Sequence, residues 1–187
     1  MATASRTVVL VEGVSDQLAV ERLARRAGRD LAAEGVTIVP MGGATNVAAF
    51  VNRFSSDGDG VRLTGLCDVG EEPYFRRALE RAGFGSDLTR EALEALGFFV
   101  CVQDLEDELI RALGGEAVEA IVEREGELER FRTFQKQPEW RARALDEQLR
   151  RFLGTFTGRK IRYAPLLVGA LDLTKIPRPL AGLLASL

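Results

Sequence analysis

Short apolar segments divide the first half of the chain, and each is followed by polar or charged residues. They cover residues 7–11, 36–40, 62–67 and 98–102. Continuous apolar runs of this length are typical of strands that are buried on both faces. Between them apolar residues recur at helical spacing, as Val20, Leu23, Ala24 and Ala27 do after the first segment. The alternation predicts an α/β fold with a mostly parallel sheet of about four strands flanked by helices.

The residue pattern in the second half of the chain is typical of helices. From residue 105 to about residue 153 it is highly charged, with a break at Pro138 and Trp140. Glu and Arg at intervals of three and four indicate solvated helix faces. We therefore predict three parts: an α/β core at residues 1–104, a helical insert or cap at residues 105–156, and a basic segment and C-terminal helix at residues 157–187 that packs back on the core.

Acidic residues follow three of the predicted strands. Glu12 ends the first and Asp68 the third, while Asp104 and Glu106 follow the fourth. Parallel strands share a carboxyl edge, and open α/β sheets bind their ligands there, so we expect these carboxylates to meet. The alternative for the first motif is that Asp16 or Ser15 caps the next helix and Glu12 merely ends its strand.

The amino-acid composition limits the catalytic groups and metal ligands that this chain can supply. Histidine is absent from the 187 residues, which excludes Ser–His and Cys–His nucleophiles and the commonest transition-metal ligand. Metal chemistry would depend on carboxylates, which favour Mg²⁺ or Mn²⁺. Cys67 and Cys101 lie in apolar contexts and are expected to be buried free thiols. The net charge of −3 neither indicates nor excludes nucleic-acid binding.

No apolar run approaches the roughly 20 residues that cross a bilayer. The N-terminus also lacks a signal-peptide pattern. We therefore expect a cytoplasmic protein that does not contact a membrane.

Candidate phosphate-binding residues fall in two groups. Gly42 and Gly43 lie between a predicted strand and a helix, where backbone amides could approach a phosphate, and Gly13 after Glu12 is a further candidate. A tight structural turn is the alternative for the glycine pair. The densest basic cluster of the chain is Arg159, Lys160 and Arg162, although such cations are mostly solvated.

These residues together resemble the Toprim domain of topoisomerases, primases and several nucleases. The stretch Val11-Glu12-Gly13 with Asp16 is similar to the V-E-G-x-x-D motif, and the strand that ends at Asp68 is similar to the Asp-x-Asp motif. The nuclease domain of the OLD (overcoming lysogenisation defect) family is the branch that the chain resembles most. The later motifs of that likeness are Asp104-Leu105-Glu106, Gly158-Arg159-Lys160 with Tyr163-Ala164, and Ile176-Pro177.

The resemblance implies a Rossmann-like sheet whose acids bind one or two Mg²⁺ or Mn²⁺ ions for phosphodiester cleavage. It implies that Glu12, Asp16, Asp68 and Glu106 are metal ligands, with Glu12 also a candidate general base. Lys160 would lie beside the scissile phosphate. Gly70 replaces the second Asp of the Asp-x-Asp motif, and Glu71 follows one residue later. Glu71 is therefore a fifth candidate metal ligand, but an acid that moves by one residue along a strand changes direction, so we expect it to be a poor substitute.

The leading hypothesis is a metal-dependent endonuclease that acts on DNA. The alternatives are a Toprim scaffold that has lost catalysis and binds nucleic acid or a protein, and a small RNA-processing nuclease of the same fold. OLD proteins also carry an ATPase, whereas no Walker loop occurs in this sequence. Either a separate ATPase is a partner or the domain acts alone, and a homodimer is a further expectation.

Overall fold

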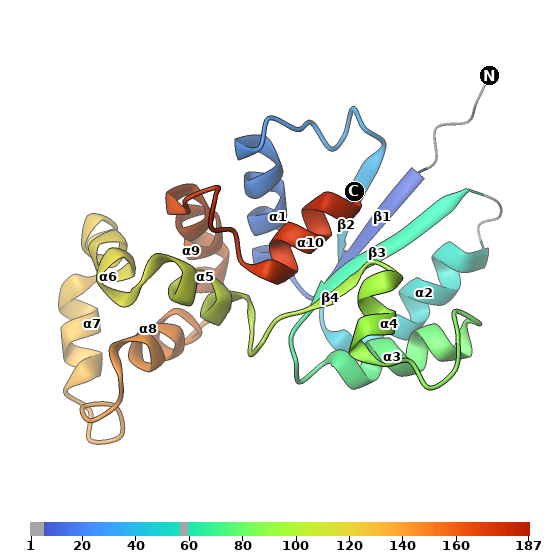
Figure 1. The fold of residues 1–187 in the computed structure, drawn as a ribbon. Helices are drawn as coiled ribbons and strands as arrows, with labels where there is room; N and C mark the ends of the chain where they lie inside the picture. Colours follow the sequence, from blue (N-terminus) through green and yellow to red (C-terminus); the bar gives the residue numbers. More distant parts are fainter. Residues whose placement is uncertain (1–5, 57–59) are drawn as a thin grey trace.

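The computed structural model describes residues 6–56 and 60–187 (Figure 1). Residues 1–5, on which the targeting prediction partly depends, lie outside the described residues. In the described part of the chain, a strand-containing half comes first and a helical half follows. None of the helices in this part has both the length and the apolar character that crossing a membrane requires.

A four-stranded parallel sheet forms the centre of the α/β half. Its strands are β1 (Arg6–Val11), β2 (Val36–Pro40), β3 (Val61–Cys67) and β4 (Phe98–Val100), in the spatial order β2-β1-β3-β4. Val9 of β1 is aligned with Ile38 of β2 and with Thr64 of β3. The predicted α/β fold with four parallel strands is confirmed, although β4 is shorter than the apolar segment that indicated it.

β1 is a central strand, and its side chains supply both hydrophobic cores. Val8 and Leu10 point into one core, while Val9 and Val11 point into the other, and all four are fully buried. A strand covered on both faces needs apolar residues at every position, because alternate side chains reach opposite faces. This explains the unbroken apolar run that identified β1 in the sequence.

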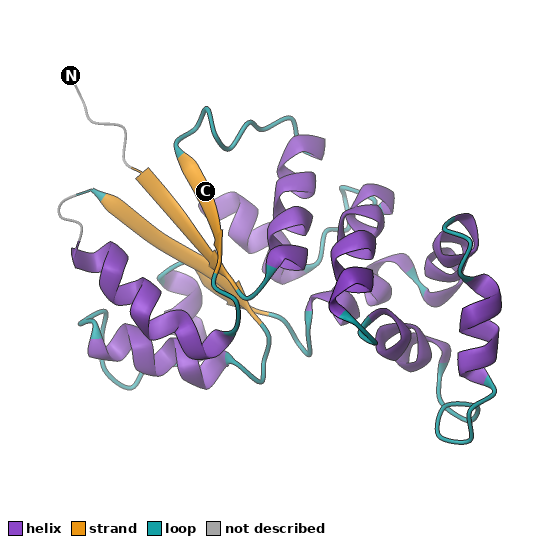
Figure 2. Ribbon diagram, turned by 180° about the vertical axis from the view of Figure 1, so that it is seen from behind, coloured by secondary structure: helices purple, strands orange, loops and turns teal. Residues whose placement is uncertain are grey.

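Helices cover both faces of the sheet (Figure 2). On one face lie α2 (Val47–Ser56), α3 (Glu72–Arg81) and α4 (Arg90–Ala95), with a short 3-10 turn at Ala44–Asn46. On the other face lie α1 (Val14–Arg26), α9 (Thr157–Ala170) and α10 (Arg178–Ser186). The segments nearest the C-terminus therefore complete the covering of a sheet whose strands lie in the first hundred residues.

The helical insert extends to one side of the sheet (Figure 1). It contains α5 (Leu105–Leu113), α6 (Gly115–Arg124), α7 (Leu128–Gln135) and α8 (Leu145–Leu153). Phe131 and Leu149 of the insert belong to the same buried cluster as Val9 of the sheet and Leu109 of α5. The insert thus shares one continuous core with this face of the sheet, and the exact division into three parts stays a prediction.

α9 runs along α1, and a side chain of α1 holds its end. The guanidinium of Arg26 donates hydrogen bonds to the carbonyl oxygens of Val168 and Leu171, each at 2.7 Å. Val168 lies in the last turn of α9 and Leu171 directly after it, where no further helical turn supplies donors to the backbone carbonyls. The basic segment that begins α9 is thereby fixed against the helix that follows β1.

The predicted buried free thiols are confirmed. Cys67 and Cys101 are both buried and unpaired with each other as a disulfide. Burial raises the pKa of both thiols, so they stay protonated and unreactive at neutral pH.

The close contact between β1, β3 and β4 at Gly65 predicts a stability effect. A Cβ atom at Gly65 would lie 2.7 Å from the Leu10 carbonyl oxygen and 2.9 Å from the Phe98 ring. We expect Gly65→Ala to lower the free energy of unfolding by about 1–3 kcal/mol, measured by urea denaturation. Gly70→Ala is the matched control because no other atom lies within 4 Å of its added Cβ. Equal stability of the two variants would contradict this packing.

Candidate metal centre

Acidic side chains from separate elements meet in a pocket at the carboxyl edge of the sheet. Glu12 follows β1 and Asp68 follows β3, and these strands are parallel neighbours. Parallel neighbours end at the same edge, which brings both carboxylates here. The pocket, called here the carboxylate pocket, has a volume of about 420 Å³. It is lined by Glu12, Gly13, Val14, Ser15, Asp16, Gly42, Gly43, Asp68, Glu106, Lys160 and Ile161.

Glu71 joins Glu12 and Asp68 in a cluster at the pocket, contrary to the expected direction of its side chain. One carboxylate oxygen from each of the three residues lies within 4.8 Å of the other two. β3 ends at Cys67, and the residues after it form a turn in which the Glu71 amide donates to the Asp68 carbonyl at 2.9 Å. A turn folds the chain back, so its first and fourth residues lie close together. The expectation from strand alternation is wrong because no strand continues past Cys67.

Asp16 both caps α1 and lines the pocket. The helix begins at Val14, and the Asp16 carboxylate accepts a hydrogen bond from the Gly13 amide at 2.8 Å. This is half of a capping box, so the capping role that the sequence left open is present. Burial, offset in part by that hydrogen bond, raises the pKa of Asp16 to about 7. The nearby charges of Glu106 and Glu12 add to the shift.

Glu106 and Lys160 form an ion pair that also lines the pocket. Glu106 is the second residue of α5 and is buried, and Lys160 lies in the first turns of α9. The Lys160 ammonium lies 2.9 Å from Glu106 Oε2. Glu106 Oε1 is buried and has no hydrogen-bond partner among the described residues. Half of this carboxylate therefore stays available to a further ligand.

Burial and mutual repulsion favour the protonated forms of the cluster. Burial is the main cause that raises the pKa of Asp68 to about 8 and the pKa of Glu71 to about 8. The charge of Asp16 adds to the shift at Asp68, and a hydrogen bond with the Glu12 side chain adds to the shift at Glu71. Two carboxyl groups can share a hydrogen bond only when one of them carries a proton. When all of these carboxyl groups are ionised, their negative charge is therefore not fully balanced by nearby positive charge.

The donor set fits a hard divalent cation. Carboxylate oxygens are the ligands that Mg²⁺ and Mn²⁺ prefer, and Glu12, Asp68 and Glu71 present them together. Glu71 Oε2, like Glu106 Oε1, is buried without a hydrogen-bond partner in the described structure. Buried polar atoms without partners are rare, and an ion or a water molecule is a common explanation. Glu12, Asp68 and Glu71 would therefore hold the metal, and Asp16 and Glu106 line the pocket around them.

The glycines predicted to bind phosphate use their amides within the protein. The Gly13 amide donates to Asp16, and the amides of Gly42 and Gly43 donate to the Glu12 carbonyl at 2.9 and 3.2 Å. Gly42 and Gly43 have φ values of 72° and 120°, which favour glycine. We correct their predicted role: they line the pocket, but these amides position Glu12 and Asp16 instead of meeting a phosphate.

Two of the predicted basic residues lie outside the pocket. Arg159 is 6% exposed, donates to both carboxylate oxygens of Glu127 at 2.8 and 3.2 Å, and lies 3.9 Å from the ring centre of Phe152. Its predicted phosphate contact is corrected to a structural role, because the guanidinium is enclosed. Arg162 is half-exposed and donates to Glu125 at 2.8 Å.

Several residues have positions or contacts at or near the site that the sequence did not indicate. Ser15 and Ile161 line the pocket beside Asp16 and Lys160, and the phase of their helices would have indicated them. Asp104 accepts the Asp107 amide at 2.8 Å as the N-cap of α5. Its second oxygen accepts a hydrogen bond from Arg150 at 2.8 Å, which connects α8 with the start of α5. The hydrogen bond between Arg150 and Asp104 joins residues 46 positions apart, so no local sequence pattern indicates it.

The raised pKa values predict how stability depends on pH. The folded-state pKa values of Asp16, Asp68 and Glu71, about 7 to 8, lie above their ordinary values of 3.8 and 4.5. Between these limits the folded protein holds protons that the unfolded chain has released, so stability is lost as pH rises through this window. We expect the free energy of unfolding in EDTA to be lower at pH 8.5 than at pH 5.5, measured by urea denaturation.

Two comparisons sharpen this measurement. Mg²⁺ should stabilise the protein more at the higher pH, because the metal competes with protons for the same oxygens. Asp68→Asn should weaken the pH dependence, because the amide does not titrate. A metal-free protein that is more stable at the higher pH, or a variant with an unchanged dependence, would show that the cluster is not protonated as described.

Comparison with known proteins agrees with this geometry. Residues 5–68 match the family model of the overcoming lysogenization defect protein-like TOPRIM domain, a range that includes Glu12, Asp16 and Asp68. The comparison with curated proteins gives no match.

Solved structures extend the likeness to almost the whole chain. The C-terminal region of the Burkholderia pseudomallei OLD protein is 20% identical, with a TM-score of 0.73 over 97% of this chain and 96% of that one. The C-terminal region of the Xanthomonas campestris pv. campestris OLD protein is 22% identical, with a TM-score of 0.75 over 97% of this chain and 91% of that one. The predicted resemblance is therefore confirmed: residues 5–68 match the OLD-like Toprim domain, and the chain has the fold of the C-terminal regions of OLD proteins.

Proposed function

We propose that this protein is a divalent-metal-dependent nuclease that hydrolyses phosphodiester bonds of DNA. The observation that supports it most is the convergence of Glu12, Asp68 and Glu71 in one pocket with the Glu106–Lys160 ion pair. A cluster of half-buried carboxylates destabilises a fold when it is ionised, unless a cation binds there. The Toprim match covers the strands that bring Glu12 and Asp68 together.

Each side chain has a chemical role in this proposal. A bound Mg²⁺ or Mn²⁺ would activate water and offset the charge of the phosphate. Glu12, Asp68 and Glu71 would hold the ion, and the Glu12 carboxylate would also accept a proton. The ammonium of Lys160 is fixed at the pocket by Glu106 and donates hydrogen bonds to phosphate oxygens as their charge develops.

The runner-up is a Toprim scaffold that binds nucleic acid or a protein without cleaving it. Gly70 at the position of the second Asp favours this reading. The position of Glu71 in the cluster opposes it, because the turn supplies a carboxylate that the motif alone lacks. An RNA substrate is the second alternative, and a panel of DNA and structured RNA distinguishes the two nucleases.

A plasmid-nicking assay tests the proposed nuclease. With Mn²⁺ or Mg²⁺ we expect wild-type protein to nick supercoiled DNA, and Glu12→Gln or Asp68→Asn to reduce the rate by about 100-fold or more through loss of a metal ligand. Glu116→Gln is the matched control, since that acid is exposed on α6 away from the pocket. Nicking by both pocket variants at the wild-type rate would remove the site assignment.

Metal titration distinguishes the nuclease from the scaffold. If Glu71 replaces the missing motif acid, Glu71→Gln should weaken Mn²⁺ binding by about 10- to 100-fold in isothermal titration calorimetry. Restoring the motif with Gly70→Asp in the Glu71→Gln background should recover part of the affinity. Wild-type protein that shows no Mn²⁺ binding dependent on Glu12 or Glu71 would support the scaffold instead.

A further inference from the structure

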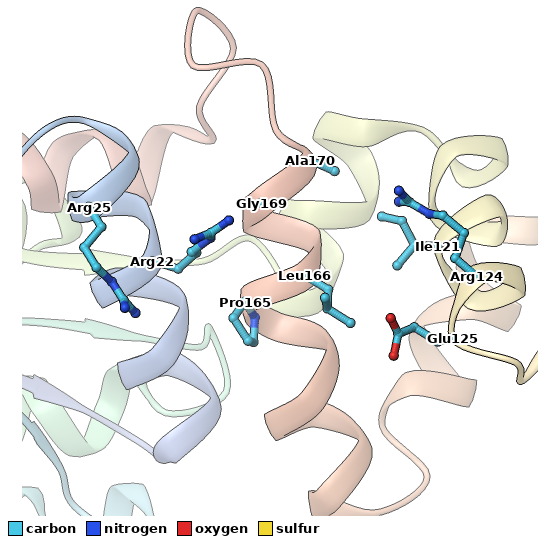
Figure 3. Close-up of a pocket in the computed structure, with 9 residues that line it drawn as sticks. All are labelled: Arg22, Arg25, Ile121, Arg124, Glu125, Pro165, Leu166, Gly169 and Ala170. Atoms are coloured by element: carbon cyan, nitrogen blue, oxygen red, sulfur yellow. The ribbon is translucent and has the colours of Figure 1, made fainter.

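A second hollow, with arginine side chains on two sides, lies between α1, α9 and α6 (Figure 3). Its volume is about 520 Å³, and we call it the arginine groove. Arg22 and Arg25 come from α1, and Arg124 comes from α6. α9 lies between them and presents Pro165 and Gly169 to the groove. The absent side chain at Gly169 leaves room for Arg22, whose guanidinium would lie 3.6 Å from a Cβ atom there.

The groove has an excess of positive charge. Among the described residues, neither Arg22 nor Arg124 makes an ion pair or a side-chain hydrogen bond. Arg25 donates to a backbone carbonyl, that of Glu21, at 3.2 Å. The one acid that lines the groove is Glu125, and its carboxylate already accepts a hydrogen bond from Arg162 at 2.8 Å. In a protein with a net charge of −3, this unbalanced surface favours an anionic ligand.

Helices α1 and α9 connect the groove with the carboxylate pocket. α1 and α9 run side by side in the same direction: Asp16 and Lys160 both line the pocket near the helix starts. At the other end, Arg26 of α1 binds the carbonyls of Val168 and Leu171 at the end of α9. The two helices therefore lead from the carboxylates to the arginines.

The same faces of both helices line the two sites. Ser15 and Ile161 line the pocket, while Arg22 follows Ser15 by seven residues and Pro165 follows Ile161 by four. Residues at these spacings lie on one face of a helix. Seven residues of helix span about 10 Å. Phosphates on one strand of duplex DNA advance by about 3.4 Å each along the axis, so the groove begins about three phosphates from the pocket.

We propose that the arginine groove binds the phosphate backbone of the nucleic-acid substrate about three phosphates from the cleaved bond. The proposal rests on the proposed nuclease function. A nucleic acid fits better than an acidic protein segment, because one continuous row of phosphates reaches both Lys160 and the arginines. Contacts with phosphates carry no sequence information, so the contribution of the groove to affinity is independent of sequence.

Fluorescence anisotropy tests this groove. The triple variant Arg22→Ala/Arg25→Ala/Arg124→Ala is compared with its parent, both carrying Asp68→Asn to prevent cleavage. The probe is a fluorescein-labelled DNA duplex of about 20 base pairs in Mg²⁺ over a range of salt concentrations. We expect affinity to fall about tenfold or more, and the slope of log affinity against log salt to become shallower by about 2 to 3.

Two further variants make the result specific. Arg62→Ala/Arg77→Ala/Arg81→Ala removes the same charge from exposed positions on β3 and α3, away from the groove, and should bind like the parent. Lysine at the groove positions should restore most of the affinity, because phosphate attraction needs charge more than the guanidinium shape. If the groove variant binds no more weakly than the control triple, the groove is not a nucleic-acid site.

A small substrate separates this proposal from the nuclease itself. Bis(p-nitrophenyl) phosphate reaches the pocket without spanning to the groove, so with Asp68 intact the groove variant should hydrolyse it at the parental rate with Mn²⁺. Lost duplex binding with unchanged hydrolysis of this diester supports the groove. A parent protein that hydrolyses neither the diester nor plasmid DNA contradicts the nuclease, while the anisotropy result still decides the groove.

Discussion

Crowding of carboxylates at one sheet edge is the constraint on which the rest of this structure depends. Parallel pairing of β1 and β3 forces Glu12 and Asp68 to the same edge, and the turn after β3 adds Glu71. Burial of such groups raises the pKa of Asp68 and Glu71, because the ionised forms lose water and repel one another. The fold tolerates these repelling carboxylates because bound protons, the Lys160 ammonium or a metal cation can offset their negative charge.

The helical half of the chain completes this site. Glu106 comes from the first helix after the sheet and Lys160 from α9, and both residues of this ion pair line the pocket. α9 is held in place by its packing on α1 and by Arg26. The insert between these elements shares the hydrophobic core of the sheet face. A change in the insert should therefore reach the pocket through the position of Lys160.

The sequence predicted those parts of the fold and site that depend on residues close together in the chain. Apolar periodicity identified the strands, and parallel strand geometry then predicted that Glu12 and Asp68 share an edge. The direction of Glu71 escaped prediction because the end of β3 and the following turn cannot be located to one residue from periodicity. The burial of Arg159 escaped prediction because its partner Glu127, the N-cap of α7, lies 32 residues away in the sequence. An ion pair between residues far apart in sequence cannot be predicted from the basic segment that contains only one of them.

Helix dipoles offer a purely structural explanation of the arginine groove, and their size decides against it. α1, α6 and α9 all end there, and Arg25 and Arg124 lie in last turns, where cations stabilise a helix. Each end carries roughly half a negative charge, so three ends offset about half of the positive charge of three arginines. Glu125 adds little, since Arg162 neutralises it. Arg22 also lies a turn before the end of α1, so the surplus charge faces the groove and is directed at a ligand outside the fold.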